Sequence, residues 1–290
     1  MANKTLTTPV KQQDWTQVIE PQGKLFDLKL REVWQYRDLI KLFVRRDFVA
    51  QYKQTILGPA WHILSPLFTS IVFTIVFGRI ANISTDGLPQ FIFYMAGNIV
   101  WAFFAGILNA TSRTFIEGAG VFGQVYYPRL ANPLSVLISR FIGFSIQFVF
   151  FICLVIYFIM NGNPLYPNIW ILLTPVLILI MGMIGLGGGV IISSLTTRYR
   201  DLQVLVGFGV SLLMYATPIV YPLSTVPEEY RILLMANPIS AIVETFRYAF
   251  LGSGSFNLYH LLYSFIFSIT IFIIGVIMFN KVERTFMDTI

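Results

Sequence analysis

Residue types suited to chemistry gather in three short polar stretches, 125–133, 197–202 and 281–288, each with at least one arginine. Arginine and aromatic side chains are enriched at the energetic centres of protein interfaces, because a planar fork of donors and a rigid ring both give oriented contacts. The stretches therefore predict docking to a soluble partner that supplies energy, although solvated loops with positive charge explain them equally well. The residues concerned are Tyr126, Tyr127, Pro128, Arg129, Arg198, Arg200, Asp201, Glu283 and Arg284.

Motifs for catalysis or nucleotide binding are missing from the sequence. There is no G-x-x-x-x-G-K-[ST] loop that would cradle nucleotide phosphates, so the chain has no route of this kind to ATP. There is also no H-E-x-x-H or G-x-S-x-G segment and no pair of carboxylates, which excludes a visible metal site or nucleophile. The glycines at 185–189 follow no strand, and we interpret them as positions of close helix packing.

The elements that position these residues are predicted to be membrane helices. Hydrophobic residues make up 56% of the chain and charged residues only 12%, against about 25% in soluble domains. Stretches without Lys, Arg, Asp or Glu, with a break at 161–164, predict six spans in an all-α integral membrane protein. The spans are 59–78, 89–110, 136–160, 169–193, 202–221 and 257–280, within a six-span transmembrane domain at 57–280.

Positive charge predicts the orientation of these spans. Of the 20 Lys and Arg residues, all but Arg79, Arg231 and Arg247 fall on one side when the six spans alternate. Because cytoplasmic loops carry the excess of Lys and Arg, the polar extension 1–27 and the tail 281–290 are both expected in the cytoplasm. The basic character of the chain then follows from the membrane, and no nucleic acid partner is predicted.

Two segments are predicted to lie at the membrane surface. In 28–56, apolar residues from Val33 to Tyr52 recur at helical spacing opposite charged residues, which indicates an amphipathic interfacial helix. The outer segment 222–255 holds prolines and charges and predicts two short re-entrant helices, near 227–236 and 239–251, between the fifth and sixth spans. Thr225 and Glu228 have the spacing of a capping box for the first of them.

The spans contain no group suited to using an ion gradient. None of the six holds Asp, Glu or Lys, and His62 and His260, at span ends, are interpreted as structural. If the chain moves anything uphill, a partner is expected to supply the work. Aromatic side chains at span ends and faces anchor and pack helices, but their faces also suit sliding contact with sugar rings. Candidates for such a passage are Trp61, Phe68, Tyr94, Trp101, Phe104, Tyr215 and Tyr221.

Several phrases of the sequence, in matching order, resemble the membrane subunit of a polysaccharide-exporting ABC transporter, the ABC-2 type permease family that handles O-antigen, teichoic acid and capsule. They are RRDFVAQYKQTILGPAW (45–61), VYYPRLANPLS (125–135), RYRDL (198–202), the outer segment 218–252 and the tail NKVERTFMDTI (280–290). The resemblance covers about residues 28–290, whereas 1–27 departs from the usual pattern.

This resemblance implies a homodimer with two cytoplasmic ATPase subunits, which would hold ATP and Mg²⁺ while this chain has no cofactor of its own. It also implies that the substrate is a lipid-linked, O-antigen-like polysaccharide, carried on undecaprenyl diphosphate and moved outward across a bacterial inner membrane. The Tyr-Pro-Arg turn and the interfacial helix would face the ATPase and the opening for lipid. By charge and fork geometry, headgroup candidates are Arg45, Arg46, Lys53, Arg129 and Arg140.

Alternatives of other classes remain open at this point. A membrane-embedded glycan ligase or acyltransferase would need a general base or an acidic site in a span or in a large outer loop, and none is visible. A passive channel would conduct without nucleotide. Export of teichoic acid or of capsular polysaccharide is the nearer alternative within the transporter class.

Overall fold

The computed structural model describes residues 30–53, 55–117, 127–197, 199 and 201–286, and within those ranges the chain is all-helical with no strand. Predictions that concern 1–27 lie outside the described residues. The helices are α1 (Leu30–Gln35), α2 (Arg37–Tyr52), η1 (Gly58–Ala60), α3 (Trp61–Phe73), the π-helix η2 (Thr74–Ile80), α4 (Gln90–Thr111), α6 (Ala131–Met160), η3 (Ile169–Leu173), α7 (Thr174–Thr196), α8 (Leu202–Tyr215), η4 (Leu223–Thr225), α9 (Glu228–Ala236), α10 (Pro238–Leu251) and α11 (Leu258–Phe286).

Among the described residues, five helical segments are long and apolar enough to cross a membrane, which confirms a multi-pass membrane protein. They are Gly58–Ile80, Gln90–Thr111, Ala131–Met160, Ile169–Thr196 and Leu258–Val282. The predicted span at 202–221 differs, because α8 ends at Tyr215 and has 14 residues. That length corresponds to about 21 Å, less than the roughly 30 Å of a hydrocarbon core. Pro218 explains the early end, since a proline disfavours helical backbone before it and cannot continue the hydrogen-bond ladder.

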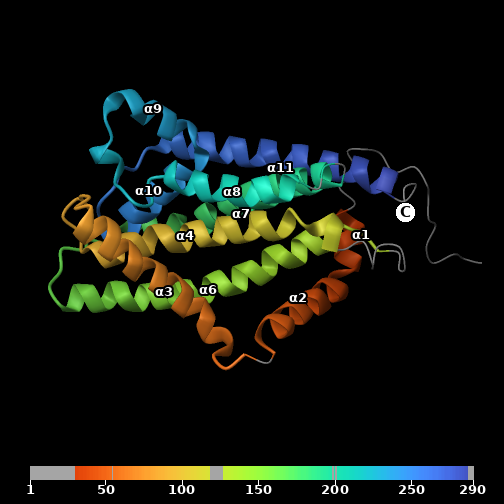
Figure 1. The fold of residues 1–290 in the computed structure, drawn as a ribbon, viewed down its shortest axis with the longest axis horizontal. Coiled ribbons are helices and arrows are strands. Elements are labelled where there is room, and N and C mark those ends of the chain that lie inside the picture. The colour runs from red at the N-terminus through yellow and green to blue at the C-terminus, as the bar shows by residue number, and fades with distance from the viewer. Residues whose placement is uncertain (1–29, 54, 118–126, 198, 200, 287–290) are drawn as a thin grey trace, which may run out of the picture.

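The long helices run side by side along the bundle, with α4 at its centre (Figure 1). Helix α4 packs against α3, α6, α7 and α10, and α7 lies between α4 and α11. One end of the bundle holds α1, the start of α8 and the last turns of α11; we call it the α1 end (Figure 1). The opposite end holds α9 and the turns that connect the helices there, and we call it the α9 end.

Glycines of α7 allow the closest helix contacts, as the sequence predicts. A Cβ atom on Gly187 would lie 2.8 Å from the Cα of Phe272 on α11, and one on Gly275 would lie 2.7 Å from the carbonyl oxygen of Gly187. On the other side of α7, a Cβ on Gly189 would lie 2.9 Å from the carbonyl oxygen of Leu108 on α4. The absence of side chains at these positions lets three helix backbones approach each other.

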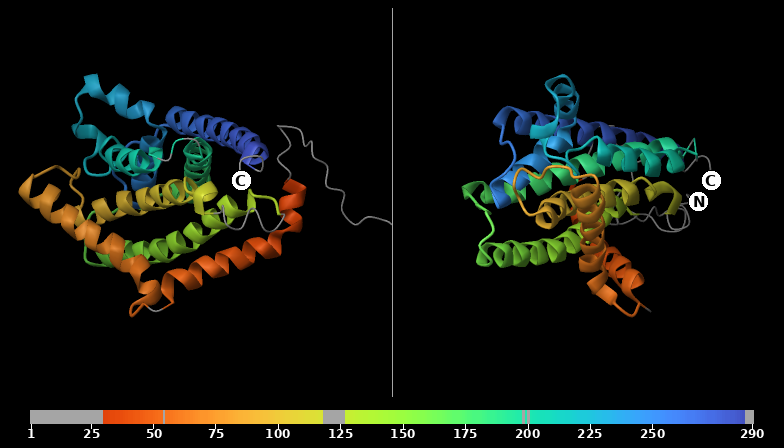
Figure 2. Two further views of the ribbon diagram at one scale, coloured as in Figure 1. Left: turned by 45° about the vertical axis from the view of Figure 1, so that its right-hand side comes forward. Right: turned by 60° about the vertical axis from the view of Figure 1, so that its left-hand side comes forward.

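The predicted amphipathic helix is present, but it is divided and shorter than 28–56. Helix α1 ends at Gln35, Tyr36 leaves helical geometry, and α2 ends at Tyr52. Its apolar face, including Ile40 and Phe43, is buried against α6. Lys53 is extended, and the chain then turns back into α3, so that α2 and α3 form a V beside the bundle (Figures 1 and 2).

The two short helices predicted near 227–236 and 239–251 are present as α9 and α10. The predicted capping box is wrong: Thr225 Oγ1 donates to the carbonyl oxygen of Pro222, and α9 has Pro227 at its N-cap with no side-chain hydrogen bond to the helix start. The cap instead belongs to α10, where Asn237 Oδ1 accepts a hydrogen bond of 3.0 Å from the backbone N–H of Ile239. Pro238 follows at the first helical position, which needs no N–H donor.

Candidate functional site

A polar cavity of about 420 Å³ lies at the junction of α2, α6 and the segment that follows α4. Charged and hydrogen-bonding side chains dominate its wall, which is unusual among the otherwise apolar helices. It is lined by Arg46, Asp47, Ala50, Gln51, His62, Ala110, Thr114, Glu117, Tyr127, Asn132, Ser135, Val136, Ser139 and Arg140. The cavity therefore brings together residues from four segments that are distant in the sequence.

Two of the five predicted headgroup cations, Arg46 and Arg140, line this cavity from opposite helices. Arg46 donates to Oδ1 of Asp47 through Nε and Nη2, at 3.0 and 2.8 Å. Arg140 has no ion pair among the described residues, and its stem passes over Gly106 of α4, where a Cβ would lie 3.4 Å from Cδ. Beside it, the buried hydroxyl of Ser139 has no hydrogen-bond partner in the described part of the chain. These donors suit an anionic ligand.

His62 connects three elements at the edge of the cavity. Its Nε2 is hydrogen-bonded to the hydroxyl of Tyr52, the last residue of α2. The ring also lies against Gly143 of α6, where a Cβ would come within 2.6 Å of His62 Cε1. Burial raises the pKa of the Tyr52 hydroxyl, and the nearby Arg140 acts against that shift. His62 therefore has the structural position that the sequence predicts, and it fixes the turn between α2 and α3.

The Tyr-Pro-Arg turn packs against the interfacial helix. The ring of Tyr127 meets the ring of Phe43 edge-on, with centroids 5.6 Å apart, and its hydroxyl donates to Asn132 Oδ1 at 3.4 Å. Burial raises the pKa of Tyr127 above its usual range. Pro128 and Arg129 are buried in the same turn. The turn is therefore in direct contact with α2.

Of the other predicted coupling residues, only Asp201 has a side chain among the described residues. Asp201 is exposed, and its backbone begins α8 at the α1 end. Glu283 and Arg284 belong to the last turns of α11, but their side chains lie outside the described residues, as do Tyr126, Arg198 and Arg200. The coupling role of all these residues stays a prediction.

The remaining headgroup candidates lie apart from the cavity. Arg45 borders a separate apolar groove between α2 and α6. Lys53 is exposed just after α2. Arg129 is 5% exposed, so its guanidinium has little access to a ligand in this arrangement.

The predicted passage aromatics fall into two groups. Tyr94, Trp101 and Phe104 on α4 are buried in the bundle core, where Tyr94 meets the ring of Phe73 edge-on and Trp101 packs against Phe104. Trp61 and Phe68 on α3 and Tyr215 on α8 are exposed on the outside of the subunit. Tyr221 is half-buried, and its hydroxyl donates to the carbonyl oxygen of Tyr215 at 2.9 Å. A passage lined by the exposed rings would lie outside one subunit.

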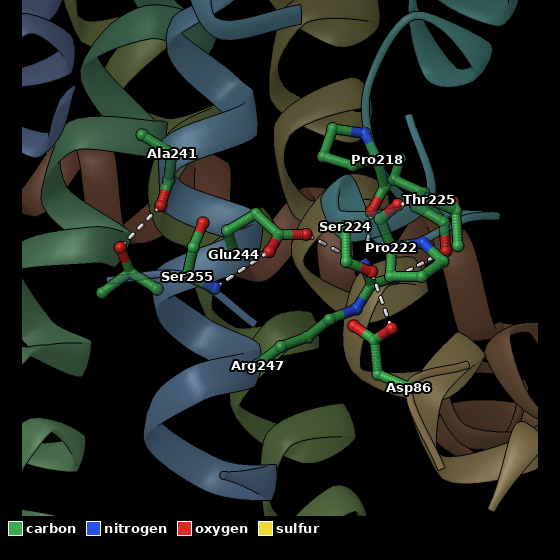
Figure 3. A network of polar contacts seen from close by, with 11 residues as sticks. Asp86, Pro218, Pro222, Ser224, Thr225, Ala241, Glu244, Arg247 and Ser255 are labelled. Carbon is green, nitrogen blue, oxygen red and sulfur yellow. Dashed lines mark hydrogen bonds and ion pairs between the residues drawn. The ribbon is translucent and has the colours of Figure 1, made fainter. Parts of the chain in front are cut away.

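A second polar cluster, which the sequence analysis did not identify as a site, surrounds Arg247 of α10 (Figure 3). Arg247 is 1% exposed, and its guanidinium donates to the carbonyl oxygens of Pro218 and Ile219 in the turn after α8. Its Nη1 lies 3.6 Å from Glu244 Oε1, and Glu244 Oε2 accepts from the backbone N–H of Ser255 at 3.2 Å. The i, i+3 spacing of two charges in an apolar helix was the available signal.

The cluster continues to the turn between the first two long spans. Ser224 donates to Asp86 Oδ1 at 2.7 Å, and Asp86 belongs to the turn that connects η2 to α4 (Figure 3). Arg247 also lies over the ring of Phe93 on α4. Arg247 and Ser224 together connect α4, α10 and the turns at the α9 end through hydrogen bonds and a cation–π contact.

The bundle, the divided interfacial helix and the two short outer helices define a multi-pass membrane protein with its polar sites at opposite ends. The chain belongs to the ABC-2 type transporter family, whose pattern matches residues 38–251, from α2 to the last residue of α10.

Individual relatives align with most of the chain. The chain is 24% identical over 252 residues to an O-antigen export system permease protein RfbA of Klebsiella pneumoniae, covering 87% of this chain and 94% of the relative. It is 26% identical to a protein of the same name from Myxococcus xanthus, covering 76% and 83%. It is 22% identical to the polysialic acid transport protein KpsM of Escherichia coli, covering 84% and 93%.

Proposed function

We propose that this chain is the membrane-spanning subunit of an ABC transporter that exports a lipid-linked polysaccharide of the O-antigen kind across the bacterial inner membrane. Two copies of the chain would assemble with two copies of a separate cytoplasmic ATPase, which binds ATP and Mg²⁺ and hydrolyses the nucleotide. The chain itself would be a transport subunit and not an enzyme.

The observation that carries this proposal is the extent of the similarity. The family pattern begins in the interfacial helix and ends with the second outer helix, so it covers nearly every element described above. Relatives named for O-antigen export and for polysialic acid transport align over 83–94% of their own length. Because O-antigen and polysialic acid are both polysaccharides, the substrate class is better supported than any individual glycan.

Six spans are part of the proposal. Helix α8 leads from the α1 end toward the α9 end, opposite in direction to α7, and α11 then returns (Figure 1). With α8 and the turn after it as the fifth crossing, both termini lie on the same side. The excess of Lys and Arg near the α1 end supports that end as the cytoplasmic side, and α9 and α10 would then dip into the membrane from the outside.

The polar cavity is the proposed place where the lipid diphosphate headgroup binds. Arg140 and Arg46 supply guanidinium forks, and Ser139 supplies a hydroxyl that has no other described partner. Asp47 and Glu117 also line the cavity. A bound headgroup would therefore have to displace Asp47 from its ion pair with Arg46. Tyr127 on the wall connects the same cavity to the turn proposed to meet the ATPase.

A dimer is part of the proposal because the described residues of one subunit do not enclose a path for a polymer. Exposed apolar side chains cover the outer faces of α3 and α8, among them Phe68, Val72, Val204, Phe208 and Tyr215. A two-fold assembly that brings such faces together can enclose a passage at its seam. Trp61, Phe68 and Tyr215 would then line it, whereas Tyr94, Trp101 and Phe104 support the wall from behind.

Genetic complementation tests the function. A Klebsiella pneumoniae strain that lacks both its RfbA permease and the ATPase of the same export system would receive this chain together with the ATPase proposed as its partner, or this chain alone. We expect surface polysaccharide to return only when both proteins are present. Restoration by this chain alone, or a purified chain that transfers glycan to an acceptor without a partner, would contradict the proposal. Capsule export is the second candidate, because of the polysialic acid relative, and the same experiment in an Escherichia coli strain without KpsM distinguishes it.

A further inference from the structure

A second groove lies between α2 and α6, and its wall is almost entirely apolar. Its volume is about 420 Å³. Helix α2 contributes Ile40, Val44 and Phe48, which are spaced by four residues and therefore form one row, and α6 contributes Ile138 and Ile142 with the same spacing. The two rows of branched and aromatic side chains line an apolar slot of the kind that a hydrocarbon chain can fill.

Two cations stand on the rim of this groove. Lys41 and Arg45 are one helical turn apart, and both are exposed. Lys41 Nζ lies 2.9 Å from Asp38 Oδ1, but this pair is on the surface, where ion pairs contribute little and exchange readily. Arg45 has no ion pair with any described residue. The groove thus combines an apolar slot with a basic rim.

We propose that this groove binds an anionic glycerophospholipid, with one acyl chain in the slot and the phosphate between Lys41 and Arg45. A lipid with a zwitterionic headgroup carries its own cation and gains less from the basic rim. Two basic residues near a membrane surface favour an anionic lipid roughly tenfold or more. Inorganic phosphate has no chain to fill the slot, so the pairing of slot and rim is specific for a lipid.

The position of the groove gives this lipid a consequence for the polar cavity. Successive helix residues point about 100° apart, so Arg45 faces the groove while its neighbour Arg46 faces the cavity. The two spaces lie on either side of the same contact between α2 and α6. A lipid in the groove would hold α2 against α6 and keep Arg46 opposite Arg140. Only this consequence rests on the proposed function; binding itself does not.

Lipid competition in native mass spectrometry tests the proposal. The full chain in nanodiscs would be offered equal amounts of phosphatidylglycerol and phosphatidylcholine, and the lipids that remain on the protein would be counted. We expect about a tenfold preference for phosphatidylglycerol, reduced several-fold by Arg45→Gln and by Ile138→Trp, which fills the slot without changing the charge. Lys53→Gln removes an exposed cation from the end of the same helix outside the groove, and should retain the full preference.

Two kinds of result would overturn the lipid proposal. Equal retention of the two lipids, or an equal loss with Lys53→Gln and Arg45→Gln, would show that no built anionic site exists. Retention of a polyprenyl diphosphate in the groove in place of phosphatidylglycerol would assign the slot to the substrate and reject a phospholipid. Each variant is first compared with the wild type by gel filtration and thermal unfolding. If the transport proposal failed, the measured preference for phosphatidylglycerol would be unchanged, so the two proposals can be tested separately.

Discussion

The guanidinium of Arg247 on α10 lies 3.7 Å from the centroid of the Phe93 ring on α4. The same group donates to two backbone carbonyls of the turn after α8 and faces Glu244. A cation buried in this way is stabilised only by these partners together, because burial removes its hydration. The relationship makes one side chain responsible for holding three elements at the α9 end.

Arg247→Met is expected to destabilise the protein by about 3–5 kcal/mol, because it leaves Glu244 buried without its cation. The double variant Arg247→Met/Glu244→Gln should recover part of the loss, since it removes the uncompensated charge. Thermal unfolding in detergent measures both. Arg79→Met, an exposed cation in the last turn of η2, is the control and should change stability little. Equal effects of Arg79→Met and Arg247→Met would contradict the assigned role.

The hydrogen bond between Tyr52 and His62 predicts coupling between the interfacial helix and the first span. Tyr52→Phe and His62→Phe should each lower stability, and the double variant should cost less than the sum, with a coupling of about 1 kcal/mol. A double-mutant cycle by chemical unfolding gives this value. Additive losses would mean that the two side chains do not interact in the membrane.

The sequence predicts most of the fold because the bilayer imposes simple rules. A span must be apolar over its length, so ion-free stretches locate five of the long helices to within a few residues at most ends. It predicts α8 too long, because apolar residues continue past Pro218 although the helix does not. Here Pro218, and not the end of the apolar stretch, determines where the helix ends.

The sites were less accessible to sequence reasoning. The partners of Arg247 are backbone carbonyls 28 and 29 residues away, and no side-chain pattern encodes a backbone acceptor. Arg46 and Arg140 were both predicted as headgroup candidates from charge alone, but their meeting in one cavity depends on how α2 packs on α6. The same packing directs Arg45 elsewhere, a distinction that two adjacent arginines in a sequence do not reveal.

Arg140→Gln is expected to reduce substrate-stimulated ATP hydrolysis of the assembled transporter about tenfold, because it removes a guanidinium fork from the polar cavity. Arg46→Gln should have a smaller effect, since Arg46 is already paired with Asp47. Hydrolysis without substrate should be unchanged in both. Lys53→Gln is the control for loss of a positive charge near the same surface. Full stimulation in Arg140→Gln would remove this residue from headgroup binding.

Neighbouring glycines of α7 are expected to respond in opposite directions to the same substitution. A methyl group on Gly187 would lie 2.8 Å from backbone atoms of Ile271 and Phe272, which cannot rotate away, so Gly187→Ala should force α7 and α11 apart and cost about 1–3 kcal/mol. At Gly188 the nearest atom is Leu108 Cδ1 at 3.5 Å, an ordinary contact.

Gly188→Ala should therefore be neutral or stabilising by up to about 1 kcal/mol, the usual gain in helix propensity. Thermal unfolding of the two variants beside the wild type makes the comparison within one turn of one helix, so differences in expression or lipid affect both alike. If Gly187→Ala proved as stable as Gly188→Ala, the close approach of α7 to α11 would be wrong. The argument that glycine is required there for backbone contact would fail with it.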